Sequence, residues 1–257
     1  MEFAKVKDLL GSFHTSYSSS GAGRSKNVEN GANLINGALL YPGDSFSVYE
    51  AVSPFDAEHG YELAGSYENG TTVETYGGGI CQVSTTLYNA VIRAELEVTE
   101  RSNHSMIVNY VDPSADAAIA GTYKDLKFVN NTDAPIYIEG YTADRQLYFN
   151  IFGQETRPAN REVSFVSETL STTQPGVQYQ AAPGRPIGYI SQTQSSHTGY
   201  TAQLWKVVTV DGVEESREVF NKSSYNASPT IIQVGTASGN PSAVGAMNAA
   251  IGSQNRG

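Results

Sequence analysis

The sequence contains a single cysteine, and this scarcity limits the chemistry open to the chain. With one thiol among 257 residues, neither an intramolecular disulfide nor a cysteine-based metal cluster can form. The four histidines lack the HxH or HExxH spacing that zinc hydrolases use. We therefore predict no metal site and no cofactor.

Charged residues and long apolar runs are also scarce. Charged residues make up 16% of the chain, and 26 acidic residues against 16 basic ones give a net charge of −10. Because no stretch is rich in lysine and arginine, we expect no nucleic acid partner. No run reaches the roughly 18 apolar residues of a membrane-spanning helix, so no transmembrane segment is predicted.

The N-terminus has no apolar leader. Met1 is followed at once by Glu2, with Lys5 close behind, so a signal peptide is not predicted. Two interpretations remain, a cytoplasmic protein or an excised part of an exported or membrane-anchored one. The residues alone do not choose between them.

The composition is typical of a β-rich globular protein with many turns. The chain has 25 glycines and 16 tyrosines, and 39% of its residues are hydrophobic. At this length the chain can form one large domain or two modest ones. The order of its hydrophobic patterns favours two.

The first half of the chain combines helical and strand patterns. Residues 27–40 carry apolar side chains at helical spacing, and a second helix is expected from the glycines at 77–79 to about residue 96. From residue 103 the period changes to two, which predicts strands at 106–111, 126–129, 135–141 and 146–152. These patterns predict an α+β domain over residues 10–153, with two main helices and an antiparallel sheet.

After a polar connector, the remaining pattern is that of strands alone. Strands are expected at 162–167, 188–192, 202–210, 213–220 and 231–234. Asp211-Gly212 is a strong signal for a two-residue hairpin turn. We predict a small all-β C-terminal domain over 160–236, followed by a flexible tail over 237–257.

The glycine loop before the second helix is the strongest candidate for chemistry. It reads Gly77-Gly78-Gly79-Ile80-Cys81-Gln82-Val83-Ser84. Three successive glycines let the backbone approach a ligand closely, and a helix start supplies unpaired N–H groups and a positive dipole end. Both favour the thiolate form of Cys81, and the amides of Gly78, Gly79 and Gln82 are candidates for an oxyanion hole.

A packed thiol is the competing interpretation, because cysteine is among the most buried residue types. A cysteine nucleophile also needs a base, usually histidine. Of the four histidines, His104 is favoured because the strand predicted at 106–111 would return it towards the start of the Cys81 helix. His14, His59 and His197 are weaker candidates. Glu100, Asp112 and Asp116 are candidate groups to orient the imidazole, and spacing does not select among them.

These residues belong to a longer pattern that resembles the VanW family over about Leu10 to Gly153. Its most specific block runs from Gly77 to Asn89. Further matching motifs are Phe13-His14-Thr15-Ser16-Tyr17, Asn33-Leu34-Ile35-Asn36-Gly37, Pro42-Gly43-Asp44-Ser45-Phe46-Ser47, Gly60-Tyr61, Arg101, His104-Ser105, Tyr110, Asp116-Ala117 and Asp125-Leu126-Lys127-Phe128. In residues 160–236, the motifs Lys206-Val207-Val208, Asp211-Gly212, Arg217-Glu218-Val219 and Ile231-Ile232-Gln233-Val234-Gly235-Thr236 resemble the G-five (G5) domain. This resemblance implies a cell-wall-binding accessory module.

The VanW resemblance implies L,D-transpeptidation of peptidoglycan. Cys81 would attack the carbonyl of the third residue of a donor stem peptide, and His104 would act as general base and then as acid. Asp116, Arg101, Ser84 and Tyr110 are the candidate orienting or substrate-binding residues. The implied partners are peptidoglycan stem peptides and glycan, and the implied location is extracellular, at the cell envelope.

Two positions depart from the family pattern. His14 stands where serine is expected, which places it outside the common machinery. Pro113-Ser114-Ala115-Asp116 lacks the Gly-Arg expected before Asp-Ala, so substrate binding here is expected to differ. Two other functions stay open at this point, a cysteine peptidase or carboxypeptidase that cuts stem peptides and a non-catalytic wall-binding protein.

Overall fold

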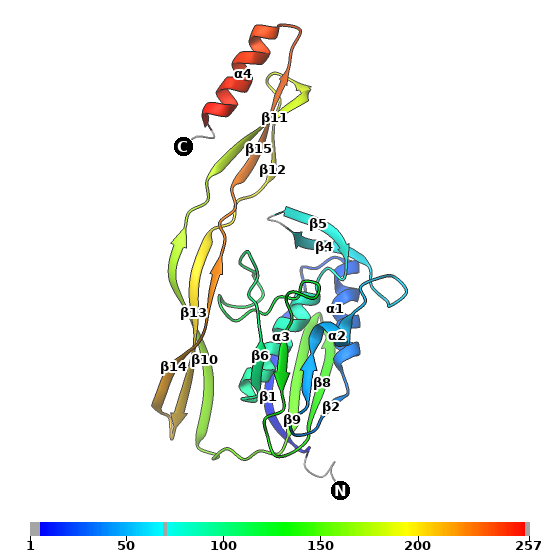
Figure 1. Ribbon diagram of the computed structural model, residues 1–257, viewed down its shortest axis with the longest axis vertical. Coiled ribbons are helices and arrows are strands. Elements are labelled where there is room, and N and C mark those ends of the chain that lie inside the picture. The colour runs from blue at the N-terminus through cyan, green and yellow to red at the C-terminus, as the bar shows by residue number, and fades with distance from the viewer. Residues whose placement is uncertain (1–5, 69–70, 255–257) are drawn as a thin grey trace. The chain divides into compact units, whose positions relative to one another are not determined.

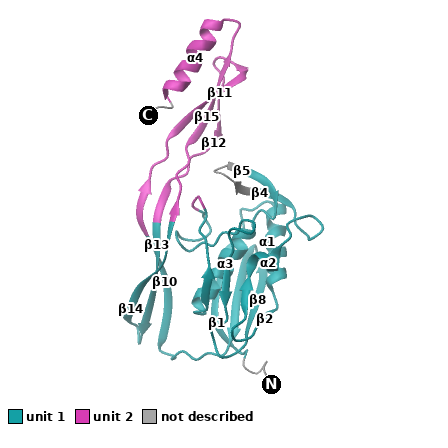
Figure 2. Cartoon of the chain, viewed as in Figure 1, with its two compact units in different colours: residues 1–104, 108–168, 202–223 teal, residues 105–107, 169–201, 224–257 magenta. Residues whose placement is uncertain are grey.

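The fold is described from a computed structural model, which describes residues 6–68 and 71–254. The chain divides into two compact units (Figure 2). The first comprises residues 1–104, 108–168 and 202–223, and the second comprises 105–107, 169–201 and 224–257. Residues of the predicted C-terminal domain thus fall in both units, and the domain boundary expected between residues 153 and 160 stays a prediction.

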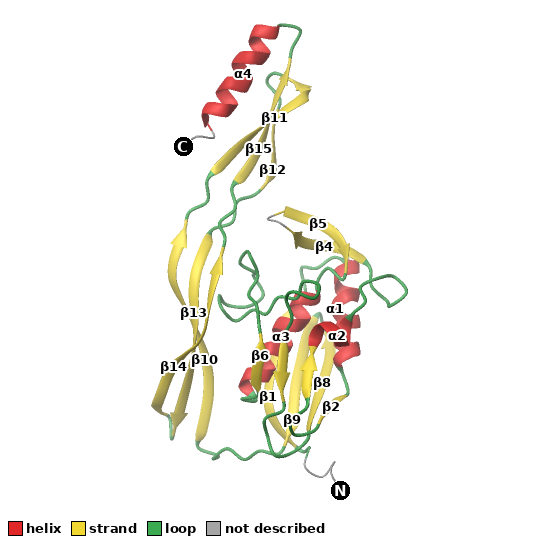
Figure 3. Cartoon of the chain, viewed as in Figure 1, coloured by secondary structure: helices red, strands yellow, loops and turns green. Residues whose placement is uncertain are grey.

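A four-stranded antiparallel sheet lies at the centre of the first unit, with helices packed against it (Figures 1 and 3). In spatial order its strands are β1 (Asp8–Ser16), β9 (Gln146–Gly153), β8 (Ile136–Ala143) and β2 (Ala38–Leu40). The helices are α1 (Ala22–Ile35) and α3 (Ile80–Arg93). Every second residue of β9 is buried, because successive side chains of a strand point to opposite faces and one face meets the helices.

Helix α3 runs through the core of the first unit. All its residues from Gln82 to Ile92 are buried. Leu87 and Val91 are fully buried in the same hydrophobic cluster as Phe149 of β9. Polar side chains such as Thr85 and Asn89 are equally buried, so they must find hydrogen-bond partners inside the protein.

Smaller elements complete this part of the chain. A three-stranded sheet contains β3 (Ser45–Ser47), β7 (Lys127–Val129) and β6 (Glu97–Glu100), and a hairpin joins β4 (Leu63–Glu68) to β5 (Thr71–Tyr76). The short helix α2 (Val48–Val52) follows β3. Asp125 accepts hydrogen bonds from the Ser47 hydroxyl at 2.5 Å and from the Tyr49 N–H at 2.8 Å, so this carboxylate holds the start of α2.

The C-terminal part of the chain is built from long strands. One sheet contains β10 (Arg161–Thr173), β13 (Gly199–Val210) and β14 (Val213–Tyr225), and another contains β11 (Val177–Pro186), β15 (Thr230–Ala237) and β12 (Ile190–Gln194). Asp211 and Gly212 both have positive φ, at 52° and 76°, as a two-residue hairpin turn requires. The predicted α+β fold with an all-β C-terminal region is confirmed.

The first predicted helix was placed too late in the chain. It begins at Ala22 instead of residue 27, because its first turns bury polar residues such as Ser25 and give no apolar signal. It ends at Ile35, and Gly37 turns the chain with φ of 92°. The apolar residues that follow form strand β2.

One strand prediction was wrong, and strand β1 was not predicted. Residues 106–111 form no strand, although Met106 is buried as their alternation suggested. Conversely, β1 gave no clear alternation, because its register is interrupted between Leu9 and Gly11. A Cβ at Gly11 would lie 2.3 Å from the Ala90 carbonyl oxygen, so this glycine permits close packing of β1 on α3.

Most of the segment predicted as a flexible tail forms helix α4 (Pro241–Gln254). The helix contains four alanines, which have the highest helix propensity, and none of its residues is buried. A helix without a buried face has little tertiary stabilisation. The flexibility of residues 237–257 stays a prediction.

Candidate active site

The glycine loop ends in the first turn of α3. Gly79 occupies the N-cap position with φ of 112°, a left-handed conformation that side chains rarely adopt. The Ile80 N–H donates to the Gly77 carbonyl at 3.0 Å, and the Gln82 N–H donates to the Gly79 carbonyl at 2.9 Å. In the part of the chain that the structure describes, the Cys81 N–H has no backbone acceptor outside its own helix, as expected in a first helical turn.

An extended segment at residues 115–119 lies along α3 and is held by every fourth helical residue. The Cys81 thiol donates to the Ile119 carbonyl at 3.4 Å and accepts from the Ile119 N–H at 3.5 Å. Thr85 bonds both backbone groups of Ala117, at 3.0 and 3.2 Å. Asn89 donates to the Ala115 carbonyl at 2.7 Å. Helix residues four apart bond segment residues two apart, because four helical residues and two extended residues both advance by roughly 6 Å.

His104 and Asp116 lie beside Cys81. The imidazole Nδ1 and the Asp116 carboxylate are 2.6 Å apart, and the His104 backbone N–H donates to the same carboxylate oxygen at 2.7 Å. The imidazole also acts on the Cys81 thiol, because each of the two groups shifts the pKa of the other. Asp116, His104 and Cys81 therefore form one coupled group of ionisable side chains. Asp116 is fully buried, whereas Cys81 is only partly buried and free of any disulfide.

The ionisation of these groups follows from their contacts. Burial would raise the pKa of the Cys81 thiol, but the hydrogen bond and charge of His104 outweigh it and lower that pKa below its ordinary value. Burial would likewise lower the pKa of His104, but its hydrogen bonds to Asp116 and Cys81 raise it to about 9. Both directions favour a thiolate next to an imidazolium, and the start of α3 adds a positive dipole end.

Arg101 fixes the carboxylate that holds His104. Its Nε donates to the Asp116 carbonyl at 2.7 Å, and its Nη2 donates to the Asp116 carboxylate at 3.1 Å. Burial alone would raise the pKa of Asp116, but the bond to His104 and the charges of His104 and Arg101 lower it. Asp116 is therefore an anion in contact with two cationic groups.

The remaining predicted site residues have different surroundings. The Tyr110 ring lies 6.5 Å from the His104 ring, and burial raises the pKa of its hydroxyl well above the ordinary value, so the phenol stays protonated beside Thr85. Gln82 is buried and donates to the Thr15 hydroxyl and the Ser16 carbonyl of β1, both at 2.9 Å. Its side chain is therefore occupied by β1 and does not point to a substrate.

Ser84 and the other histidines lie outside this group. Ser84 is fully buried, and its hydroxyl has no partner among the described residues. His14 stacks on Tyr148 of the central sheet, with ring centroids 5.2 Å apart. His59 pairs with Asp56 at 2.7 Å, and His197 contacts Ser228 at 3.0 Å. The structure brings only His104 to the cysteine.

Sequence reasoning missed three residues that support the site. Asn27 of α1 donates to the Gly78 carbonyl at 2.9 Å and also bonds both backbone groups of Glu62, which fixes the glycine loop. Thr85 and Asn89 lie in the block that resembles the VanW family, but no role was predicted for either side chain. The spacing of Cys81, Thr85 and Asn89, four residues apart, was the signal available in the sequence, because it places three polar groups on one helical face.

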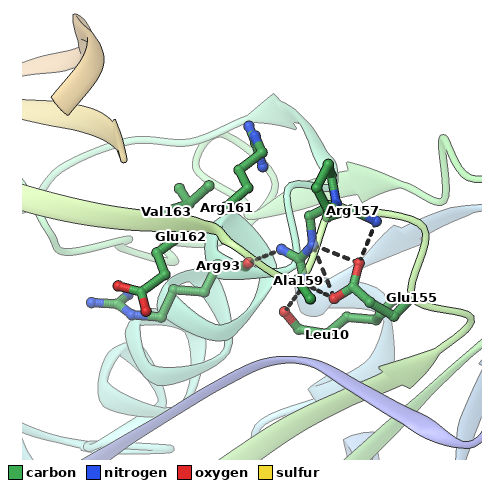
Figure 4. Close-up of a pocket in the computed structure, with 9 residues that line it drawn as sticks. Leu10, Arg93, Glu155, Arg157, Ala159, Arg161, Glu162 and Val163 are labelled. Carbon is green, nitrogen blue, oxygen red and sulfur yellow. Dashed lines mark hydrogen bonds and ion pairs between the residues drawn. The ribbon is translucent and has the colours of Figure 1, made fainter. Parts of the chain in front are cut away.

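A cavity of about 410 Å³ lies at the other end of α3, about 18 Å along the helix from Cys81 (Figure 4). Its lining includes Arg93, Arg157 and Arg161. Arg157 donates to the carboxylate of Glu155 and to two backbone carbonyls, and Arg161 pairs with Glu95 at 2.6 Å. Since these two guanidinium groups already have partners, the cavity is a weaker candidate site than the cysteine.

Neither a metal centre nor a membrane span is seen in the described ranges. No group of three or more histidine, cysteine, aspartate or glutamate side chains within 6–68 and 71–254 has a geometry that could hold a metal ion. Over the same residues, no helix has the length and hydropathy needed to cross a bilayer.

Two curated proteins are similar to this chain. The uncharacterized protein YoaR of Bacillus subtilis is 38% identical over 146 residues, which cover 57% of this chain and 48% of that protein. The Vancomycin B-type resistance protein VanW of Enterococcus faecalis is 27% identical over 154 residues, which cover 56% of each. The chain thus spans about half the length of the curated relatives it matches.

Two solved structures and two family descriptions also match parts of this chain. The IgA1 protease G5 domain covers 30% of this chain and 94% of its own, with 24% identity and a TM-score of 0.23, and HP0197-G5 covers 29% and 95%, with 16% identity and a TM-score of 0.18. The family described as VanW like protein matches residues 23–152, and the G5 domain matches residues 166–237. Because the first match covers half of the sequence, this chain belongs to the VanW family and carries a G5 domain after the VanW region.

Proposed function

We propose that this chain is a peptidoglycan L,D-transpeptidase that works through a thioester on Cys81. The observation that carries the proposal is the hydrogen bond between Asp116 and His104, together with the coupling of His104 to the thiol of a partly buried cysteine. A lowered thiol pKa beside a protonated imidazole is the arrangement that activates a cysteine nucleophile at neutral pH. The VanW relationship supplies the cell-wall context.

In the first half-reaction the Cys81 thiolate attacks the carbonyl carbon of the third residue of a donor stem peptide. In this proposal the developing oxyanion accepts a hydrogen bond from the N–H of Cys81, with the N–H of Gly79 as a second donor. The Gln82 N–H, expected from the sequence to take part, is already bonded to the Gly79 carbonyl. As the bond to the terminal D-alanine breaks, the His104 imidazolium gives its proton to the leaving amine.

In the second half-reaction the side-chain amine of an acceptor stem attacks the thioester. His104, now neutral, takes the proton of that amine, and the Cys81 thiolate leaves. The product is an amide cross-link between two third residues, and the thiolate–imidazolium pair is restored. Asp116 keeps the imidazole in one orientation through both steps, as a buried carboxylate partner does.

The G5 domain is proposed to hold the enzyme on the wall, in contact with peptidoglycan glycan. A protein with these partners acts outside the cytoplasm, at the cell envelope. This location agrees with the scarcity of cysteine, because the chain has no unpaired thiol other than Cys81 that could be oxidised.

The function is tested by incubating the protein with disaccharide-tetrapeptide and following the products by mass spectrometry. A cross-linked dimer that has lost one D-alanine and is not formed by Cys81→Ala is the expected result. Disaccharide-tripeptide without dimer would indicate a hydrolase that uses the same residues with water as acceptor. Unchanged substrate would support a non-catalytic wall-binding protein and contradict the proposal.

A further inference from the structure

Strand β14 extends polar side chains to the residues that hold the candidate active site. The Arg101 Nη1 donates to the Ser223 hydroxyl at 2.9 Å. The Asn221 amide donates to the Tyr88 hydroxyl at 2.5 Å, and Tyr88 lies on α3 two turns after Cys81. Both β14 residues belong to the same compact unit as Cys81, although they lie in the segment that matches the G5 domain.

Ser114 joins these two contacts into one hydrogen-bonded group. Its hydroxyl donates to the side-chain amide oxygen (Oδ1) of Asn221 at 2.6 Å and lies 2.8 Å from the Ser223 hydroxyl. Ser114 is fully buried and has φ of 69°, a left-handed conformation that a residue with a side chain keeps only when its surroundings fix it. The Ser114 carbonyl accepts a hydrogen bond from Arg101 Nη2 at 3.2 Å. Ser114 and Ser223 are therefore both bonded to the guanidinium group of Arg101.

Arg101 uses different nitrogens for Asp116 and for Ser223. Its Nε and Nη2 donate to the carbonyl and the carboxylate of Asp116, and its Nη1 donates to the Ser223 hydroxyl. A planar guanidinium held at one nitrogen is fixed at the others, because its donors form a rigid fork. Ser223 therefore sets the orientation in which Arg101 presents itself to Asp116, and Asp116 orients His104.

We propose that Ser223 and Asn221 are positioning residues for the Cys81–His104–Asp116 group, so that the G5-matching segment supports the reaction centre in addition to any wall binding. The inference rests on the proposed function for its biological meaning. Its physical content concerns only the state of the thiol and can be measured without a substrate. The positions act through Arg101 and touch no reacting atom.

The single cysteine makes the test direct. The rate at which iodoacetamide alkylates the 257-residue chain reports the thiolate of Cys81 alone, because its sequence contains no other cysteine. The charged and titratable groups that act on this thiol are His104 and Asp116, and Tyr110 stays protonated beside it. If Asp116 is held less firmly, it stabilises the His104 imidazolium less. The pKa of the Cys81 thiol then rises, and the midpoint of the alkylation profile moves to higher pH.

For Ser223→Ala we expect the midpoint of the alkylation profile to rise by at least half a pH unit, which is about a threefold loss of thiolate below the midpoint. Ser223→Thr keeps the hydroxyl and is expected to restore the original profile. Lys222→Ala is the matched control, because Lys222 is exposed on the same strand between the two proposed residues. Its profile is expected to match that of the unchanged protein.

Asn221→Ala provides a second measurement if Ser223→Ala does not fold, with folding judged by circular dichroism. It leaves the Ser223 hydroxyl beside Arg101 and is expected to shift the midpoint in the same direction by a smaller amount. Superimposable profiles for whichever of these variants fold would overturn the proposal. Failure of the proposed transpeptidation would show separately, as an unchanged muropeptide in a protein whose thiol still responds to Ser223.

Discussion

Among single residues, Asp116 has the strongest effect on the charges of the candidate active site. It is fully buried and contacts two cationic side chains, so its charge determines whether His104 is protonated. Asp116→Asn keeps the shape but removes the charge. We expect the Cys81 pKa to rise towards its ordinary value and the turnover of muropeptide to fall by a factor on the order of a hundred or more. Alkylation profiles and product assays measure the two effects.

Asp112→Asn is the control for that substitution, because Asp112 lies in the same loop and has no contact with the imidazole among the described residues. A thiol profile unchanged in Asp116→Asn would show that the carboxylate does not govern the pair. From the sequence alone, Glu100, Asp112 and Asp116 were equal candidates to orient His104. All three flank it, and their spacing does not show which carboxylate contacts the imidazole.

The pH dependence of activity follows from the two shifted groups. Activity needs Cys81 deprotonated and His104 protonated, so the profile of kcat/KM is expected to be bell-shaped. Its upper limb falls as pH rises through about 9, where the imidazolium loses its proton. Its lower limb lies below the ordinary thiol value, because the Cys81 pKa is lowered. An upper limb near the ordinary histidine pKa of about 6.5 would contradict the Asp116 contact.

At the scale of elements, the glycine loop depends on a close approach between backbones. A Cβ at Gly78 would lie 2.6 Å from the Ala64 carbonyl oxygen in β4, so Gly78→Ala must displace the loop from the hairpin. We expect a loss of about 1–3 kcal/mol of folding free energy and a drop in alkylation rate, because the start of α3 moves with the loop. Thermal unfolding and alkylation kinetics test this.

Gly21→Ala is the matched change for the loop variant. Gly21 has φ of −65° and an added Cβ would meet nothing within 4 Å, so only a small effect is expected. Equal losses at the two positions would show that space at Gly78 is not the cause. The sequence indicated that the glycines were required, but their neighbour, strand β4, was not predicted, so the physical reason could not be given.

The end of α3 is tied to strands β10 and β13 by a charged cluster centred on Glu95. Burial would raise the pKa of Glu95, but hydrogen bonds and charges from Arg161 and Lys206 lower it to about 2. The ion pairs measure 2.6 Å and 2.8 Å. We expect Glu95→Gln to cost about 2–3 kcal/mol, a fall of roughly 5–10 °C in Tm, because two half-buried cations lose their partner.

The same cluster predicts an acid dependence of stability. Since the folded pKa of Glu95 lies below its unfolded value, its contribution is present above about pH 4.5 and is lost as pH falls towards 2. Glu97→Gln, at an exposed position on β6, should leave this dependence unchanged. An acid transition identical in Glu95→Gln and the unchanged protein would refute the contribution of this ion-pair cluster.

For the whole molecule, the helix–sheet class and most of the late strands could be predicted from alternating apolar residues. Every second residue is buried throughout β9 and in β8 as far as Gly140. The position of His104 could not be derived in the same way. Its approach to Cys81 was expected from a strand at 106–111 that does not form. The actual cause is the pairing of residues 115–119 with α3, which brings Asp116 and hence His104 to the sulfur.

The two regions of the chain also make separable contributions at this scale. If the G5 domain holds the wall, Cys81→Ala should sediment with purified peptidoglycan sacculi as fully as the unchanged protein, because the substitution leaves residues 166–237 intact. A pull-down at moderate salt, with a net-negative protein of similar size as control, measures this. Loss of binding in Cys81→Ala would mean that retention on the wall depends on the thiol and not on the G5 domain.

The central claim is that Cys81 forms a thioester with a stem peptide, and intact-protein mass spectrometry tests it most directly. After brief incubation with disaccharide-tetrapeptide and acid quenching, we predict a mass increase equal to the muropeptide minus D-alanine. The adduct should map to the peptide containing Cys81, be released by hydroxylamine and be missing in Cys81→Ala. No adduct on folded protein whose thiol is still alkylated rapidly at neutral pH would contradict the account.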